Sequence, residues 1–116
     1  MMIEKFEDVI AWKKSKELVM NIYKQFNQCR DYSYKDQIQR AAISIMNNIA
    51  EGFERRTNKE LINFLYIAKG SSGEVRSMLY LARELNYITD IENEKLMISC
   101  VEISRILAGF IKSLKI

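Results

Sequence analysis

Hydrophobic residues in this chain recur every three or four positions along four long stretches, which is the spacing of amphipathic α-helices. The first stretch runs from about Asp8 to about Asn27, and a second from about Tyr34 to about Glu54. The polar and aromatic segment from Gln28 to Tyr34 separates them and is predicted to be a loop. The apolar side of the first helix is formed by Trp12, Val19, Tyr23 and Phe26, with Ala11, Leu18 and Ile22.

Two capping sequences mark the starts of the other helices. Thr57-Asn58-Lys59-Glu60 has the S/T-x-x-E form, in which the threonine and glutamate side chains satisfy unpaired backbone groups. It predicts a helix from about Lys59 to about Leu85, and Thr89-Asp90-Ile91-Glu92 predicts one from about Ile91 to about Leu114. Four amphipathic helices with short connections predict an all-α, antiparallel up-and-down four-helix bundle, as a single domain over residues 1–116.

The second and third helices carry more apolar surface than one bundle core needs. A helix that faces one core shows a stripe somewhat over 100° wide, whereas the second helix shows an apolar arc of about 200°. Some of these side chains could fold back under loops, but a patch of this size is unusual on a monomer. We therefore expect an oligomer whose interface uses the surplus side chains. These are Ile43, Met46, Phe53, Ile62, Tyr66, Ile67, Met78 and Leu81.

The amino-acid composition mainly excludes classes of catalytic and metal-binding site. The chain has no histidine, which removes Ser-His and Cys-His nucleophile pairs and the Glu-x-x-His pattern of di-metal bundles. Its two cysteines, Cys29 and Cys100, belong to no close-spaced pair, so we expect two reduced thiols and no metal site. Cys100 is expected to be a small core residue. The sequence predicts a protein that is not an enzyme and has no cofactor and no small-molecule substrate.

Charge and hydropathy bear on location and partners. The net charge of +3 is mild, so it does not by itself demand a nucleic-acid partner. The first eight residues are charged rather than apolar, and no apolar run approaches the roughly 20 residues that span a bilayer. We expect a cytoplasmic protein without membrane contact.

The stretch "NNIAEGFERRTNKE", residues 47–60, could carry a site. Asn48, Glu51 and Arg55 fall on one side of the second helix by their spacing. One interpretation is that they tie this helix to the third helix or to the next subunit. The other is a polar site that presents arginines to phosphate or to a protein carboxylate. Candidate contacts for such a partner are Arg55, Arg56, Arg40 and Lys59.

The stretch "GSSGE", residues 70–74, has the look of a phosphate-binding loop, but it lacks the preceding strand and the Lys-Ser/Thr of a P-loop. It lies inside the third predicted helix. A glycine there costs roughly 1 kcal/mol against alanine, so we expect another helix to approach closely at this point. The candidates for a polar face or subunit interface are Asn48, Glu51, Gly52, Gly70 and Ser71.

Three segments resemble the bacterial four-helix bundle family of 23S ribosomal RNA intervening-sequence proteins. They are residues 6–19, residues 37–88 with Asn48-Ile49-Ala50-Glu51-Gly52 and Arg55-Arg56, and the capped last helix. The resemblance implies a bundle that assembles into a ring-like homopentamer without enzymatic activity. More distantly, the chain is similar to a basic pentameric accessory protein of diversity-generating retroelements, which binds reverse transcriptase and nucleic acid.

The sequence departs from the family pattern at three positions. Met46 stands where proline is common, Gly73 where leucine is usual, and Asn86 where the third helix usually ends in glycine. Asn86 can still adopt the left-handed conformation of a helix C-cap. Two hypotheses follow for function: an oligomeric binding module that acts with RNA or a nucleoprotein, or an adaptor ring that binds a protein such as a reverse transcriptase without touching nucleic acid.

Overall fold

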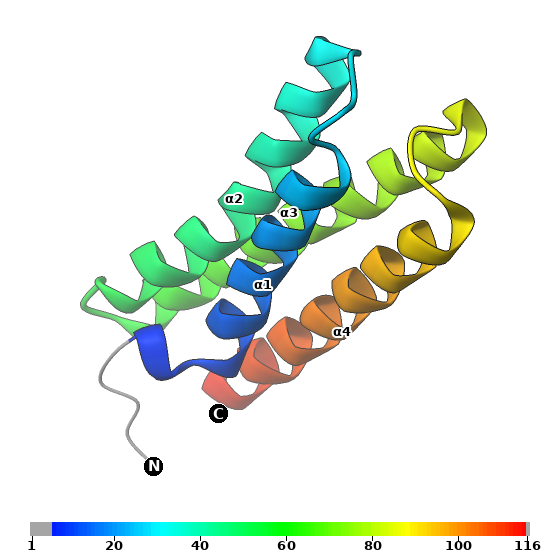
Figure 1. The fold of residues 1–116 in the computed structure, drawn as a ribbon. Helices are drawn as coiled ribbons and strands as arrows, with labels where there is room; N and C mark the ends of the chain where they lie inside the picture. The colour runs from blue at the N-terminus through cyan, green and yellow to red at the C-terminus, as the bar shows by residue number, and fades with distance from the viewer. Residues whose placement is uncertain (1–5, 116) are drawn as a thin grey trace.

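Four helices, packed side by side, make up the computed structural model, which describes residues 6–115. A single-turn 3₁₀ helix, η1 (Phe6–Asp8), precedes α1 (Ile10–Gln25), α2 (Tyr32–Phe53), α3 (Asn58–Leu85) and α4 (Asp90–Leu114). The bundle is elongated, at 44 × 20 × 19 Å (Figure 1). The predicted all-α, up-and-down four-helix bundle is therefore confirmed.

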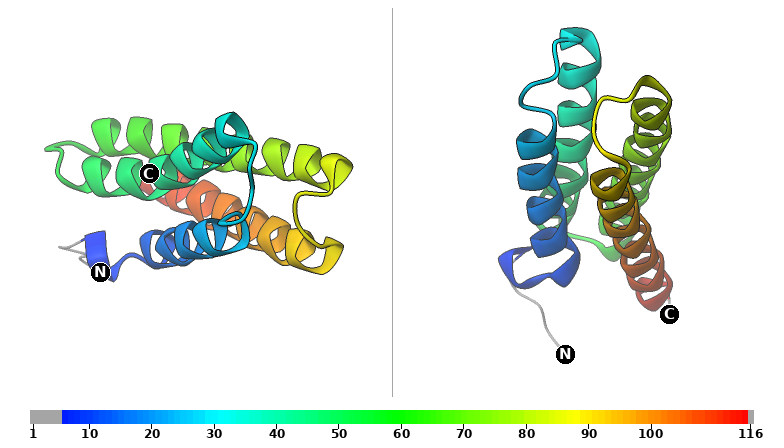
Figure 2. Two further views of the ribbon diagram at one scale, coloured as in Figure 1. Left: turned by 45° about the horizontal axis from the view of Figure 1, so that its top comes forward. Right: turned by 45° about the vertical axis from the view of Figure 1, so that its right-hand side comes forward.

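The helices occupy the corners of a square in chain order. Each helix packs against the next, α4 packs against α1, and within residues 6–115 the backbones of the diagonal pairs α1–α3 and α2–α4 lie farther apart. Figures 1 and 2 show that the start of α1, the α2–α3 corner and the end of α4 lie at one end of the bundle. Segments distant in the sequence therefore meet there.

The capping sequences place the starts of α3 and α4 within one residue of the predictions. The Thr57 hydroxyl accepts a hydrogen bond from the Glu60 N–H at 3.1 Å, and the Thr89 hydroxyl accepts one from the Glu92 N–H at 3.2 Å. At the far end of α3, Asn86 takes a left-handed conformation with φ of 57°. Asn86 thus replaces glycine as the C-cap.

The other boundaries differ from the predictions. Residues 6–8 form the separate η1 turn, so α1 is shorter than expected at both ends, running from Ile10 to Gln25. The second helix begins at Tyr32 rather than Tyr34, because the Asp31 carboxylate accepts the Tyr34 N–H at 3.1 Å. Asp31, within the segment predicted to be a loop, is therefore the N-cap of α2.

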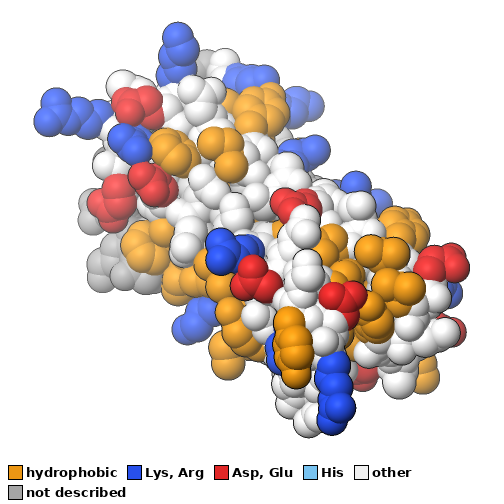
Figure 3. Space-filling view, turned by 90° about the horizontal axis from the view of Figure 1, so that it is seen from above, with side chains coloured by type: hydrophobic (Ala, Val, Ile, Leu, Met, Phe, Trp, Pro, Cys, Tyr) orange, Lys and Arg blue, Asp and Glu red, His pale blue; other side chains and the backbone are white. Residues whose placement is uncertain are grey.

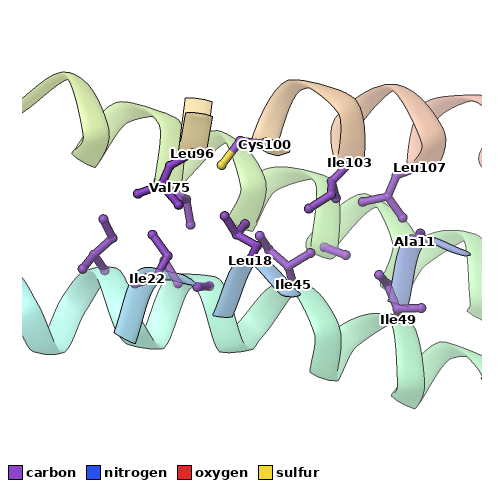
Figure 4. Packing of buried hydrophobic residues seen from close by; sticks show 14 of the residues in the cluster. Ala11, Leu18, Ile22, Ile45, Ile49, Val75, Leu96, Cys100, Ile103 and Leu107 are labelled. Carbon is purple, nitrogen blue, oxygen red and sulfur yellow. The ribbon is translucent and has the colours of Figure 1, made fainter. Parts of the chain in front are cut away.

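Buried aliphatic side chains from all four helices meet along the axis of the bundle (Figure 4). Two predictions about this core are wrong. Tyr23, predicted to face inward, is 44% exposed because it lies at the outer margin of the α1 stripe. Met78, predicted to lie at an oligomer interface, is only 8% exposed because it packs into this chain's own core. No helix among the described residues is long and apolar enough to cross a membrane.

Candidate functional site

The end of the bundle where α2 turns into α3 contains a hollow of about 540 Å³. The residues around it come from the end of α2, the start of α3 and the last turn of α4. They are Gly52, Phe53, Arg55, Arg56, Thr57, Asn58, Leu61, Phe110, Ser113 and Leu114. We call this feature the corner hollow. It contains the two adjacent arginines of the motif singled out in the sequence.

Gly52 brings the two walls of the corner together. It is buried, and a Cβ at this position would lie 2.9 Å from the Leu61 Cδ1 and 3.0 Å from the Phe64 Cβ. These separations are shorter than van der Waals contact, so α2 and α3 approach this closely only because residue 52 has no side chain. Gly52 therefore fixes the spacing of the elements that present the arginines.

The two arginines differ in how they are held. Arg55 pairs with Glu51 one turn earlier, at 2.9 Å from Nη2 to Oε1, and its guanidinium lies 4.8 Å from the centroid of the Phe64 ring. Arg56 is exposed, and among the side chains that the structure describes no carboxylate lies within 4.0 Å of it. Among the described side chains, Glu51–Arg55 is the one ion pair within this motif. Arg56 is left available to an incoming anion.

The walls of the corner hollow combine an apolar base with a positive rim. The Phe53 and Phe110 rings pack at 5.7 Å between centroids, and Leu61 and Leu114 extend this surface. The rim includes the first residue of a 28-residue helix, whose N-terminal N–H groups favour negative charge. Within the described part of the chain no aspartate or glutamate lines the hollow. Its chemistry suits an anionic group attached to an apolar or aromatic body.

Asn48 and Ser71, which the sequence placed on a polar face, belong to a hydrogen-bonded link between α2 and α3. The Asn48 amide donates to the Ser44 carbonyl at 2.8 Å and to the Ser44 hydroxyl at 3.0 Å, and the Ser44 and Ser71 hydroxyls lie 2.8 Å apart. On the other side of α3, Ser72 donates to the Cys100 carbonyl at 3.1 Å. These contacts lie within one chain and hold the helices in register.

Two other expected residues lie apart from the corner hollow. Arg40 precedes Arg55 by fifteen residues along α2, a rise of about 22 Å, and pairs with Asp36 at 2.8 Å. Of the small residues where a close helix approach was predicted, Ser71 and Ser72 contact α2 and α4, whereas a Cβ at Gly70 meets nothing within 4 Å in this chain. The close approach is at Gly52. Lys59 lies in the first turn of α3, beside the hollow but not among its lining residues.

The predicted interface side chains divide by burial. Tyr66, Ile67 and Leu81 are 48%, 51% and 47% exposed on the outer side of α3. Tyr80 and Leu85, which were not among the predicted interface residues, are 62% and 46% exposed and continue the same surface at helical spacing. Apart from the buried Met78, the rest are half-buried, with Phe53 and Ile62 packed against the core. These are Ile43, Met46, Phe53 and Ile62.

The opposite end of the bundle contains a hydrogen-bonded cluster of polar side chains that no sequence motif indicated. The Tyr87 hydroxyl donates to the Asp31 carboxylate at 2.5 Å, which links the α1–α2 and α3–α4 connections. This bond and the one from the Tyr34 N–H lower the pKa of Asp31, and the same carboxylate raises the pKa of Tyr87 to about 12. Tyr34 donates to the Met78 carbonyl at 2.6 Å. The cluster is structural, since its polar groups satisfy one another.

The two cysteines are separate free thiols, and the described residues contain no group of three or more side chains that could hold a metal ion. Cys100 is fully buried, as predicted, and burial raises the pKa of its thiol to about 12. Cys29 is half-buried in the α1–α2 connection.

Comparison with known proteins gives matches that cover most of the chain. The family model described as "23S rRNA-intervening sequence protein" matches residues 7–109. A crystal structure of a protein with unknown function from the S23 ribosomal protein family of Bacteroides thetaiotaomicron is similar, with a TM-score of 0.84 and 28% identity over 89% of this chain and 99% of that one. Comparison with curated proteins gave no match. The family resemblance read from the sequence is confirmed.

Proposed function

This chain belongs to the 23S rRNA-intervening sequence protein family, and we propose that it is a non-enzymatic binding module that works as a homo-oligomer and binds an anionic partner at the corner hollow. The observation that carries the binding role is Arg56, which lines the hollow and has no carboxylate within 4.0 Å among the side chains that the structure describes. An unneutralised guanidinium above an apolar wall favours a ligand with both charge and a flat body.

The partner that this chemistry favours is single-stranded RNA. Arginine recognises phosphate through its fork of donors, and unstacked bases pack against aromatic rings and guanidinium planes. The hollow offers both kinds of group, with Phe53 and Phe110 in its wall and Arg55 and Arg56 on its rim. Its volume of about 540 Å³ is in the range of small-ligand sites.

A second candidate is an adaptor ring that binds a protein partner, such as a reverse transcriptase, without contact to nucleic acid. The apolar wall formed by Phe53, Leu61, Phe110 and Leu114 supports this alternative, because protein interfaces place aromatic and aliphatic anchors beside arginine. In this case the arginines would meet a carboxylate of the partner.

The homo-oligomer is supported by the outer side of α3. Tyr66, Ile67, Tyr80, Leu81 and Leu85 are each between 46% and 62% exposed, and aromatic and aliphatic side chains of this size present roughly 500 Å² of apolar surface in total at about 200 Å² each. We propose that further copies cover this surface in a closed ring of five, the assembly that the family resemblance implies.

RNA binding is tested by fluorescence anisotropy of a labelled single-stranded RNA over a series of salt concentrations. We expect the affinity to fall as salt rises, and Arg56→Ala to weaken binding and to reduce the salt slope by about 1. Arg40→Ala is the matched control, because it removes the same charge from a residue already paired with Asp36. Equal effects of the two substitutions, or binding that does not respond to salt, would rule out a phosphate contact at the corner hollow.

A further inference from the structure

The outer side of α3 carries a regular stripe of exposed positions. Asn63, Ile67, Gly70, Glu74, Ser77, Leu81 and Glu84 follow one another at alternating spacings of four and three residues, and all are exposed. This is the spacing of a coiled-coil seam, here directed away from the bundle. Gly70 and Ser77 leave room for close approach, since a Cβ at residue 70 would meet nothing within 4 Å. In the view of Figure 3, hydrophobic side chains of this protein lie at the surface between charged ones.

The outer side of α1 carries a second stripe with the same alternation. Ile10, Lys13, Glu17, Met20 and Lys24 are spaced by three and four residues, and all are exposed. Ile10 and Met20 are the most exposed apolar side chains of this helix, at 61% and 65%. A hollow of about 760 Å³ lies along this side, and its lining includes Ile10, Lys13 and Met20.

The two stripes have opposite charge. Among the described residues the α3 stripe contains Glu74 and Glu84 and no basic residue, whereas the α1 stripe contains two lysines against the single Glu17. The lysines Lys13 and Lys24 lie eleven residues apart, about 16 Å, and the two glutamates lie ten residues apart, about 15 Å. Charges on the two stripes therefore recur at nearly the same separation. The other outer faces offer no such match: the exposed large apolar residues of α2 are limited to Tyr32, and α4 mixes both signs of charge around Ile98.

The α1 stripe and the α3 stripe also lie at similar positions along the bundle axis. Lys14 of α1 pairs with Glu102 of α4 at 3.1 Å, and Ser72 of α3 bonds to the carbonyl of Cys100 and to Ser104 on the same helix. Lys14 and Ser72 contact the same part of α4 and therefore lie at nearly the same position along the bundle axis. α1 and α3 run in the same direction in an up-and-down bundle, so a rotation about an axis along the bundle sets α1 of one copy parallel to α3 of the next without a large shift.

We propose that the α1 stripe of one copy packs against the α3 stripe of the next, with the two helices parallel, Lys13 and Lys24 facing Glu74 and Glu84, and Met20 beside Leu81. This assignment rests on the self-assembly stated under the proposed function and names the faces that make it. The contact is heterologous, because it joins two different faces of the chain, and such a contact closes into a ring when its rotation permits.

The test is sedimentation velocity of the full chain at low salt, with three charge variants. K13E/K24E and E74K/E84K each place like charges across the contact, so the concentration at half-assembly should rise about tenfold or more. The fourfold variant K13E/K24E/E74K/E84K restores opposite charges and should assemble as the wild type does. The control E94K/R105E reverses two charges on the outer side of α4 and should leave assembly unchanged. Thermal unfolding by circular dichroism checks that each variant is folded.

The possible results distinguish a failure of the α1–α3 contact from a failure of the proposed homo-oligomer. A wild-type chain that stays monomeric overturns both. A wild-type oligomer that is unaffected by either double variant, or a folded fourfold variant that fails to reassemble, overturns the α1–α3 contact and leaves the homo-oligomer standing. Loss of assembly in both double variants with recovery in the fourfold variant supports the contact, because a nonspecific loss of stability would not be reversed by two further charge reversals.

Discussion

Gly52→Ala is expected to destabilise the protein relative to the same substitution at an open position. A Cβ at residue 52 would lie 2.9 Å from the Leu61 Cδ1 and 3.0 Å from the Phe64 Cβ. The Leu61 methyl group is the end of a flexible side chain and can rotate away. The Phe64 Cβ moves only with the backbone of α3, so the substitution must push the two helices apart at the corner.

The magnitude follows from two opposing effects. Glycine inside a helix costs about 1 kcal/mol against alanine, so Gly52→Ala gains that amount in helix propensity. Overpacking a tight contact costs about 1–3 kcal/mol. The net change in the free energy of unfolding should therefore be a loss of about 0–2 kcal/mol. Gly109→Ala is the matched control: Gly109 lies inside α4, a Cβ there meets nothing within 4 Å, and the substitution should stabilise by about 1 kcal/mol.

Urea unfolding followed by circular dichroism measures both variants. We expect the free energy of unfolding of Gly52→Ala to fall below that of Gly109→Ala by about 1–3 kcal/mol. The reasoning would be refuted if both substitutions stabilised the protein equally. The close approach of α2 and α3 would then not depend on the missing side chain.

Two further predictions concern the thiols and the loop cluster. At pH 8 a thiol-specific alkylating reagent should modify Cys29 rapidly and Cys100 only on unfolding. The reason is that Cys100 is fully buried and the pKa of its thiol is raised to about 12. Mass spectrometry of peptides measures both rates of modification, and equal rates would contradict this prediction. The Asp31–Tyr87 contact should stabilise the fold above pH 3.8, the ordinary pKa of the carboxyl group, and this stabilisation should be lost as pH falls through the lowered pKa of Asp31. The stabilisation should also be lost as pH rises through the Tyr87 pKa of about 12. Tyr87→Phe should flatten the acid side of this profile in thermal unfolding, and an unchanged profile would contradict the assignment.

The fold followed from the sequence because its signals are local. The threonine caps Thr57 and Thr89 and the three- and four-residue apolar spacing depend only on neighbouring residues, so the starts of α3 and α4 were predicted within one residue. The start of α2 was placed too late because the Asp31 cap stands among polar and aromatic residues that resemble a loop. Burial was harder to predict at the edge of a stripe, where a small rotation decides whether Met78 packs inward or Tyr23 points out.

The candidate site could be predicted only in part from the sequence. The spacing of Arg55 from Glu51 indicates an ion pair, and that pair forms. The wall of the corner hollow could not be predicted, because Phe110 and Leu114 join it from α4, more than fifty residues away along the chain. The role of Gly52 could not be predicted either, since a close approach depends on how two helices pack. Gly70, unlike Gly52, is open on its outer side within this chain.

The central claim, that this bundle works as an assembly of identical copies, is tested most directly by sedimentation equilibrium of the wild-type protein over a range of micromolar concentrations. The account predicts a closed species with a mass near five times that of the 13.7 kDa chain, which persists on dilution until the interface dissociates. A mass of 13.7 kDa at every concentration would contradict it, because the apolar side of α3 would then remain exposed to water.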